Sequence, residues 1–455
     1  MHHDRRKARA YDQRRASSTK PVNQQYFTYC PRHCNSTCTT GFPVSTHDNT
    51  NGNPILRDSN FRRYYIGVWF YTSGFWVLKV AIGWAAWELS HSAYWTGLVA
   101  AAYMAPAMIL SPVFGVMADR MRLKRGVLLI VTLQVLMGAS LALASFTGWL
   151  TIERLAVFSL LYGTLSAAYH PIRLTIVGRL VRREMIPATV GLNAIAFNTA
   201  RIIGPALAGL LLAAYGTATA LLCGSLLYLP HLLLFSGVTL RSRTKSASDS
   251  KPWYFAFGEG LAYAIQLPIM APVVLFTLIN GGVGRSLFEI LPAVVGDLLL
   301  SGAETLATLT AAAGAGAILA GLTIARFKMT TRNQLTGLIA ALVVCCITTL
   351  VISFTTAKNA AALLCAVAGF STTFVGVSSQ SLLQLALADE YRGRVMSLWT
   401  TVSFGAPAIG ALLIGLFAET YGLGESLAYA ATAGVVLSLI ITPLALSRVK
   451  SDSRV

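Results

Sequence analysis

Apolar positions dominate the chain from Phe61 to about residue 446, in stretches of roughly twenty residues or more separated by short polar interruptions. An α-helix rises 1.5 Å per residue, so about twenty apolar residues cross a hydrocarbon core of about 30 Å. A soluble multidomain enzyme could not hide so many apolar runs. The pattern predicts twelve transmembrane helices, at residues 63–87, 94–117, 126–146, 154–177, 189–214, 218–240, 268–295, 303–325, 334–354, 359–385, 395–418 and 425–446.

The twelve predicted helices divide into two sets of six. The longest inside connection, Arg241–Lys251, is polar, serine-rich and basic, and it separates the sixth helix from the seventh. A constant offset of 206 residues relates the two sets at equivalent points, because it matches Gly115 with Gly321, Arg120 with Arg326, Gly209 with Gly415, and Tyr215-Gly216 with Tyr421-Gly422. We therefore expect an all-α membrane protein of two pseudo-symmetric six-helix bundles, with substrate bound between them near the membrane midplane.

The same pattern predicts how the whole chain is organised. The first sixty residues are polar and rich in arginine, serine, threonine and asparagine, a composition typical of disorder. The segment after the long connection has an amphipathic pattern and can lie on the inner membrane surface. The predicted divisions are a disordered cytoplasmic tail (1–60), a first bundle (61–240), a cytoplasmic linker with an amphipathic helix (241–267), a second bundle (268–447) and a short cytoplasmic tail (448–455).

Composition and charge agree with a membrane protein. Charged residues make up 12% of the chain, about half of the share in soluble proteins, and the mean hydropathy is +0.61. The net charge of +18 lies in the predicted inside loops, and Arg154 and Lys358 are the clear cases outside. This asymmetry follows the positive-inside rule. We expect a multi-pass protein of the bacterial inner (plasma) membrane with both termini in the cytoplasm, and no nucleic-acid partner.

The seven cysteines do not predict a functional site. Four cysteines lie in apolar spans and are expected to pack as small hydrophobic residues. Cys30, Cys34 and Cys38 form a C-x3-C-x3-C cluster with His33 in the N-terminal tail. A metal site there is conceivable, but the spacing does not match the C-x2-C zinc patterns. We expect an unstructured extension, with no metal and no cofactor.

The loop after the second predicted helix carries a charged motif, Gly115-Val-Met-Ala-Asp119-Arg120-Met-Arg122-Leu-Lys124-Arg125. Asp119 lies at a helix end beside cations, where it can pair with Arg120 or face the positive N-terminus of a neighbouring helix. The motif resembles the major facilitator signature G-x-x-x-D-R-x-G-R-R, with Arg122 in place of the second glycine. The resemblance implies that Gly115, Asp119, Arg120, Lys124 and Arg125 form a cytoplasmic latch between the bundles. The alternative is a basic cluster that only sets topology.

The fifth predicted helix carries small residues at regular spacing. Small residues allow close helix approach, and a proline removes a backbone hydrogen bond. The helix resembles the exporter motif of the same superfamily, G-x8-G-x3-G-P-x2-G-G, with alanine at two glycine positions. The resemblance implies efflux rather than uptake, although ordinary small-residue packing is the alternative. The matching residues are Gly191, Gly204, Pro205 and Gly209, and the alanines are Ala200 and Ala208.

Ionisable residues inside the predicted spans need a reason, because each costs about 2.5–3.5 kcal/mol on insertion scales. Glu289 is the only acidic residue well inside the spans, so it is the candidate proton carrier. Arg285 lies four residues earlier, on the same helix face, and can pair with it. A structural ion pair is the alternative. Lys79, Arg201 and Asn280 are candidate residues of a substrate cavity that accepts anions such as catecholates or carboxylates.

Five segments together resemble the relatives of the enterobactin exporter, called transmembrane secretion effectors. The resemblance implies export of small amphipathic molecules such as siderophores or macrolides by a transporter that is a monomer and not an enzyme. No ATP-binding loop is present, so we expect alternating access driven by a gradient, with proton antiport. A lysophospholipid flippase of the same fold is the alternative. The segments are NFRRYYIGVWFYTSGFW, NAIAFNTARIIGPALAG, FGEGLAYAIQLP, EILPAVVGD and DEYRGRVMSLWTTVSFGAPAIGALLIG.

Overall fold

The computed structural model describes residues 54–182, 185–241, 262–263, 265–267, 269–327, 329–387 and 389–452. The tail cluster of Cys30, His33, Cys34 and Cys38 and nearly all of the predicted linker lie outside these residues, and so does the amphipathic helix expected there. The predictions for these two segments therefore stay predictions.

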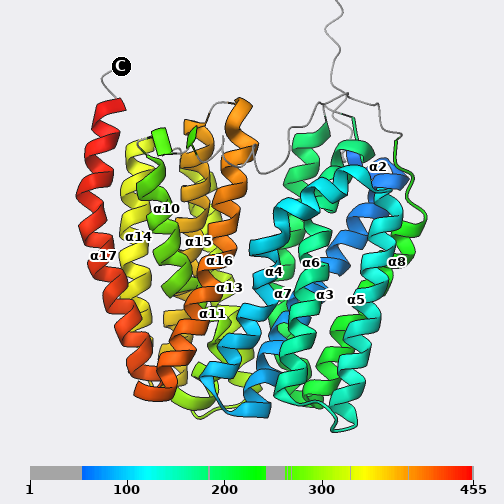
Figure 1. The fold of residues 1–455 in the computed structure, drawn as a ribbon, viewed down its shortest axis with the longest axis horizontal. Coiled ribbons are helices and arrows are strands. Elements are labelled where there is room, and N and C mark those ends of the chain that lie inside the picture. Colours follow the sequence, from blue (N-terminus) through cyan, green and yellow to red (C-terminus); the bar gives the residue numbers. More distant parts are fainter. Residues whose placement is uncertain are drawn as a thin grey trace, which may run out of the picture. The chain divides into compact units, whose positions relative to one another are not determined.

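The first bundle follows the predicted order of spans. Its helices occupy the blue-to-green half of the ribbon (Figure 1), and the short α2 precedes the first long one. Their bounds are α2 (Pro54–Arg57), α3 (Ser59–Ser90), α4 (Ala93–Arg120), α5 (Leu123–Phe146), α6 (Ile152–Leu180), α7 (Ile186–Leu226) and α8 (Tyr228–Ser236).

One apolar segment of this bundle contains two spans. Gly191–Ser236 runs for 46 residues, which as a straight helix would measure about 69 Å, more than twice the hydrocarbon core. Gly216 interrupts it with φ 79° and ψ 176°, a conformation that suits glycine because it lacks a Cβ. The described residues contain eleven such apolar segments, and because this one is broken at Gly216 into two helices, they form twelve spans.

The second bundle repeats the arrangement, but its first span is interrupted. Two π-helical stretches, η2 and η3, lie within it. Between them the helix is interrupted at Ile290, and Pro292 lies in the first turn of the short α12 that follows. The elements are α10 (Met270–Ile279), η2 (Asn280–Arg285), α11 (Ser286–Glu289), α12 (Leu291–Ala293), η3 (Val294–Leu298), α13 (Ala303–Arg326), α14 (Thr331–Ile352), α15 (Lys358–Ala386), α16 (Asp389–Tyr421) and α17 (Leu423–Asp452).

Short polar side chains fix where several helices begin. The side chains of Asp58, Ser92, Thr151 and Thr330 each accept a hydrogen bond from a backbone N–H in the first turn of the helix that follows. Such caps satisfy donors that would otherwise lack a partner at the start of a helix. They confine the loops between spans to a few residues, as the apolar pattern predicted.

Two predicted boundaries are wrong by several residues. The tail was expected to reach residue 60, but Pro54–Arg57 is helical and α3 begins at Ser59, capped by Asp58. The second bundle was expected to end at residue 447, but α17 continues to Asp452. Helix ends outside the hydrocarbon core are polar and hydrated, so the apolar pattern does not reveal them.

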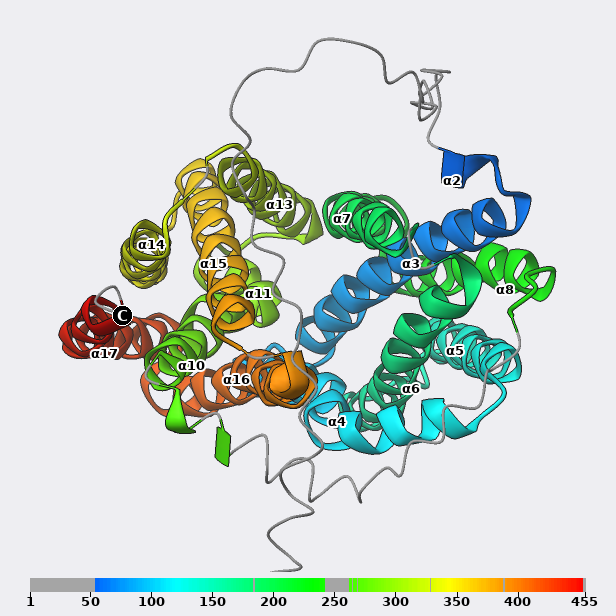
Figure 2. The same ribbon diagram turned by 90° about the horizontal axis from the view of Figure 1, so that it is seen from above.

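The two bundles meet along two pairs of helices. From above, α7 lies beside α13 and α4 lies beside α16 (Figure 2), and these pairs also have extensive contacts. A Cβ on Gly97 of α4 would lie only 2.3 Å from the carbonyl oxygen of Ala411 in α16. A Cβ on Gly209 of α7 would lie 2.0 Å from Cβ of Ala307 in α13. The bundles approach this closely because both positions lack a side chain.

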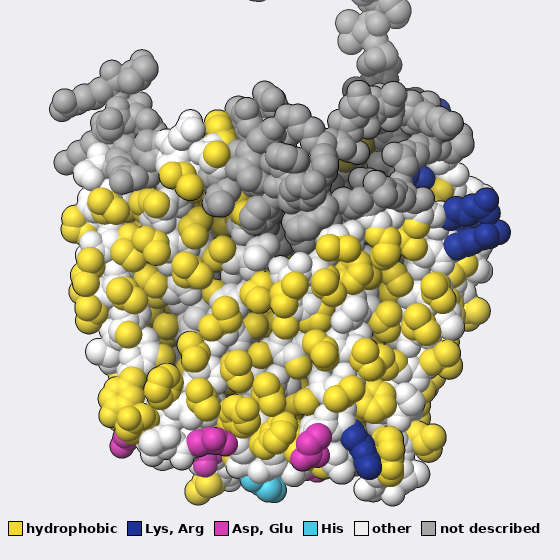
Figure 3. Space-filling model, in the orientation of Figure 1, with side chains coloured by type: hydrophobic (Ala, Val, Ile, Leu, Met, Phe, Trp, Pro, Cys, Tyr) yellow, Lys and Arg dark blue, Asp and Glu magenta, His cyan; other side chains and the backbone are white. Residues whose placement is uncertain are grey.

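The outer surface of Gly52–Val455 is suited to lipid. Hydrophobic side chains cover the middle of the face seen in Figure 3, and the visible acidic side chains gather at its lower edge. Many of the exposed side chains are large aliphatic ones, including Leu210, Leu233 and Leu363, each at least 66% exposed. In water such a surface would be costly, whereas in a bilayer it faces acyl chains.

Candidate substrate cavity between the bundles

A cavity of about 300 Å³ lies between the two bundles. The first bundle contributes residues of α3, α4 and α7 to its wall, and the second contributes residues of η2, α11, α12, α13, α15 and α16. Both bundles therefore form the wall of the cavity. This is the place where the internal repeat predicted the substrate site.

The clearest polar contact in the cavity is an ion pair between the bundles. Nζ of Lys79 on α3 donates to Oε1 of Glu289 on α11 at 2.7 Å. The side chains are 21% and 9% exposed, respectively. The Lys79 ammonium also lies 5.3 Å from the ring centroid of Trp76, on the same helix, which adds a favourable cation–π contact. The pair joins residues that are 210 positions apart in the chain.

The sequence suggested a different partner for Glu289. Arg285 lies four residues earlier and was expected to be able to pair with it, but Nη1 of Arg285 donates instead to the carbonyl oxygen of Ser403 on α16, at 3.4 Å. Among the described residues, the one ion pair of Glu289 is with Lys79. Arg285 ends the π-helical η2 and Glu289 ends α11, and π-helical turns of this kind are frequent at functional sites.

Arg201 reaches across the cavity from the first bundle. Its Nη2 donates to Oγ1 of Thr373 on α15 at 3.2 Å. Both residues line the cavity, as the sequence predicted for Arg201. Their hydrogen bond is a second polar link between the bundles, made by a neutral acceptor rather than by a carboxylate.

Asn280 does not occupy its predicted place. Its side chain is 2% exposed, and its Nδ2 donates to the carbonyl oxygen of Thr372 at 3.3 Å. It is not among the described residues that line the cavity, whereas Lys79 and Arg201 are. Asn280 begins η2, and its side chain packs against α15 instead.

Aromatic rings form much of the remaining wall, and the sequence did not single out most of them for this role. Trp76, Tyr103, Phe288 and Trp399 line the cavity. Nε1 of Trp399 donates to Oγ1 of Thr277 at 3.3 Å, which fixes the orientation of that indole. The spacing of aromatic residues along the spans does not show which rings face inward.

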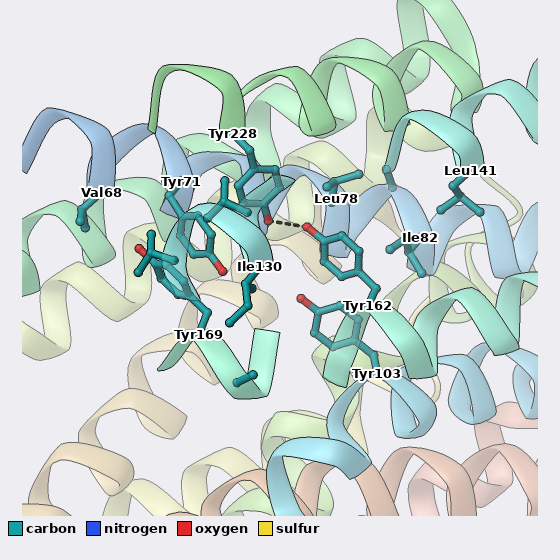
Figure 4. Packing of buried hydrophobic residues seen from close by; sticks show 14 of the residues in the cluster. Val68, Tyr71, Leu78, Ile82, Tyr103, Ile130, Leu141, Tyr162, Tyr169 and Tyr228 are labelled. Atoms are coloured by element: carbon teal, nitrogen blue, oxygen red, sulfur yellow. Dashed lines mark hydrogen bonds between the residues drawn. The ribbon is translucent and has the colours of Figure 1, made fainter. Parts of the chain in front are cut away.

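A cluster of tyrosines supports the wall from inside the first bundle. Figure 4 shows the Tyr162 hydroxyl donating to the Tyr228 hydroxyl, at 2.6 Å. Tyr71 stacks on Tyr169 with ring centroids 4.0 Å apart, and Tyr103 stacks on Tyr162 at 6.0 Å. Tyr103 is thus held between the cluster and the cavity, and its position depends on packing in the first bundle.

The exporter-like motif of α7 lies directly behind this site. Pro205 lines the cavity, and a Cβ on Gly204 would lie 2.5 Å from Cβ of Trp76. Gly209 makes the close contact with α13 described above, whereas a Cβ on Gly191 would meet nothing within 4 Å. Three of the four motif residues therefore have a packing or lining role here, and Gly191 has none that the structure shows.

The predicted latch is described only in part. The side chains of Gly115, Asp119 and Arg120 lie outside the described residues, although their backbone belongs to α4. Lys124 and Arg125 lie in the first turn of α5, where no acidic side chain is present. The latch therefore stays a prediction.

The amino-acid sequence is similar to that of known membrane proteins. A family model described as transmembrane secretion effector matches residues 51–455. The staphyloferrin A transporter of Staphylococcus aureus is 28% identical over 174 residues, which cover 36% of this chain and only 44% of that relative. The multidrug efflux pump Tap of Mycobacterium tuberculosis is 24% identical over 374 residues, covering 76% of this chain and 83% of Tap.

Solved structures resemble the fold at low sequence identity. A bacterial homologue of the human lysosomal transporter Spinster, in an inward-facing and unoccupied conformation, superposes with a TM-score of 0.69 at 15% identity over 86% of this chain and 97% of that one. The nucleoside transporter NupG superposes with a TM-score of 0.64 at 15% identity, over 85% and 99% of the two chains. At these identities the likeness concerns the fold alone.

Proposed function

The chain belongs to the transmembrane secretion effector family of major facilitator transporters, and on that premise we propose that it exports small amphipathic organic molecules by alternating access. Membership makes it an efflux or secretion transporter rather than an enzyme. The proposed cargo is siderophore-like or macrolide-like, in keeping with relatives named for a siderophore and for multidrug efflux. The cavity walled by both bundles carries the proposal, because relative movement of the bundles changes which side it faces.

Contacts between the bundles at the predicted extracellular end support this mechanism. Gly97, near the start of α4, packs on the backbone of Ala411. Trp87, near the end of α3, is buried in a hydrophobic cluster formed otherwise by the second bundle, and a Cβ on Gly296 would overlap its indole. These contacts close the outer end without covalent links, so the bundles can separate there as rigid bodies.

Proton antiport is the proposed energy source, and Glu289 is the proposed carrier. It is the only described acidic side chain among the cavity residues, and its carboxylate holds Lys79 of the other bundle. Protonation of Glu289 removes its charge and with it the attraction across the cavity. Proton binding would thereby loosen a contact between the bundles, which is the coupling that an antiporter needs.

We also propose that the protein lies in the bacterial inner membrane as a monomer with both termini in the cytoplasm. The charge asymmetry of the predicted loops supports this orientation. Labelling of single cysteines at positions 57 and 151 by a membrane-impermeant maleimide in intact cells tests it. Labelling is expected at position 151 only, and labelling at position 57 would reverse the topology.

The test of function uses inside-out membrane vesicles and proteoliposomes loaded with a pH-sensitive dye. A carboxylate siderophore, a macrolide and a labelled lysophospholipid are supplied under an imposed proton gradient, with the wild type beside Glu289→Gln. The matched control is Glu304→Gln, an exposed acid in the first turn of α13. Export predicts substrate-dependent proton movement that Glu289→Gln abolishes and Glu304→Gln keeps.

Other outcomes assign other functions. Proton movement that survives in Glu289→Gln would leave the antiporter in place and return the Lys79–Glu289 pair to a structural role. Translocation of the lysophospholipid alone, without proton movement, would replace the exporter by a flippase of the same fold. Movement of the substrate out of the inside-out vesicles rather than into them would make the protein an importer.

A further inference from the structure

The cavity carries more positive charge than the protein neutralises. Its described lining includes three cations, Lys79, Arg201 and Arg285, and one anion, Glu289. The lysine and the glutamate form an ion pair, so their charges cancel within the wall. Neither guanidinium group forms an ion pair among the described residues, and their positive charges repel each other. Glu289 attracts Arg285 at longer range, but this one carboxylate already pairs with Lys79.

No other described acid is placed to compensate them. Apart from Glu289, the described acidic residues lie near helix ends, either at the predicted extracellular side, as Glu88 and Glu304 do, or at the predicted cytoplasmic side, as Asp58 and Asp389 do. Figure 3 shows acidic side chains along the lower edge of the molecule, away from its middle. Glu88, at the end of α3, accepts a hydrogen bond from Thr217 there. Two unneutralised charges in a membrane-embedded cavity are expensive, and this cost indicates that the counter-charge comes from a bound molecule.

The hydrogen-bonding groups of the cavity point to the same kind of ligand. A guanidinium has five N–H donors, and the structure records one hydrogen bond for Arg201 and one for Arg285. The remaining N–H donors of the two guanidinium groups suit the oxygen atoms of carboxylates.

We propose that the cavity binds a dianionic amphipathic molecule, with one carboxylate on Arg201, a second on Arg285, and its apolar part against Trp76 and Trp399. Arg201 belongs to the first bundle and Arg285 to the second, so such a ligand contacts both bundles at once. This inference names the substrate class of the exporter proposed above and rests on that proposal. A neutral or cationic drug would leave the two arginines uncompensated.

The first test measures charge preference in the wild-type protein, without any gradient. Purified protein in lipid nanodiscs is titrated with four dansyl probes of similar size: dansyl-glutamate with two negative charges, dansyl-glutamine with one, dansyl-glutamine amide with none, and dansylcadaverine with a positive charge. Fluorescence anisotropy gives each Kd. The dianion is expected to bind at least tenfold more tightly than the neutral probe, and the cation most weakly.

Variants then assign the preference to the two arginines. Arg201→Gln and Arg285→Gln are each expected to weaken dansyl-glutamate about tenfold to a hundredfold, as loss of a charged hydrogen bond does, with little effect on the neutral probe. Arg201→Lys should keep most of the preference because it keeps the positive charge. Lys358→Gln, which removes an exposed cation at the predicted outer end, is the matched control.

The outcomes separate this inference from the proposed function. Equal or tighter binding of the neutral or cationic probe by wild type would overturn the dianion site, even if the arginine variants fail to fold and even if export is intact. Unchanged dansyl-glutamate affinity in both glutamine variants would overturn it as well. Tight dianion binding in a protein that never exports would leave this site standing and remove the exporter.

Discussion

The contact between α4 and α16 at the outer end predicts how one added methyl group changes the transporter. In Gly97→Ala, the new Cβ would lie 2.3 Å from the carbonyl oxygen of Ala411 and 2.9 Å from its carbonyl carbon. The closest favourable carbon–oxygen contacts are about 3.3 Å, so the two helices must separate by about 1 Å. Both clashing atoms belong to the backbone, which has no rotamer to change.

Forced separation of this kind costs about 1–3 kcal/mol in packed interiors. The cost falls on the state in which the outer end is closed, because an open outer end removes the contact. The population of the closed state relative to the outward-open state should therefore fall about 5- to 150-fold. A substrate that binds from the cytoplasm then has a weaker apparent affinity, because fewer molecules are competent to bind it.

Spin labels on either side of the outer end measure this shift. Nitroxides on cysteines at positions 151 and 358, in a background without native cysteines, report the distance between the bundles by double electron–electron resonance. Gly97→Ala should increase a longer-distance population. Gly178→Ala is the matched control, because a Cβ there meets nothing within 4 Å. If the two variants give the same distance distribution, the reasoning from the α4–α16 contact is refuted.

Three further predictions concern side chains of the wall and its support. Glu289→Gln should lower the free energy of unfolding by about 1–3 kcal/mol because it leaves Lys79 unpaired, and adding Lys79→Met should restore part of it; additive thermal shifts would show that the two residues are not coupled. Gly296→Ala should displace the Trp87 indole, which its Cβ would overlap, and shift its fluorescence emission, whereas an unchanged spectrum would contradict that contact. Tyr162→Phe should cost about 1–2 kcal/mol through its lost hydroxyl bond, and an unchanged melting temperature would argue against the tyrosine cluster as the support.

The apolar pattern fixed the spans because the bilayer imposes one length on every helix that crosses it. Apolar stretches of about twenty residues are visible without knowledge of their neighbours in space, and glycine and short polar caps mark where helices turn. Because only apolar residues signal a span, the prediction missed the ends of α3 and α17, which are polar and extend past the apolar run. The broken span from Met270 to Leu298 was also invisible, since π-turns depend on packing rather than on composition.

For the site, the sequence identified individual residues but not their partners. Lys79, Arg201, Arg285 and Glu289 were recognisable because charge inside a membrane span is rare. Spacing within one helix suggested that Arg285 pairs with Glu289, and it offered no means to place Asn280 behind the wall.

The sequence by itself determined that the chain crosses a membrane in two related halves, which side its basic loops favour, and which buried charges demand an explanation. Only the tertiary structure decided that Glu289 pairs with Lys79 across the cavity and that, in the part of the chain it describes, neither Arg201 nor Arg285 forms an ion pair. The physical reason is the distance along the chain over which each interaction acts. Helix formation and membrane insertion depend on residues that are neighbours in the sequence and on the lipid. An ion pair between residues 210 positions apart depends on how two rigid bundles face each other, and one sequence does not encode that in any local pattern.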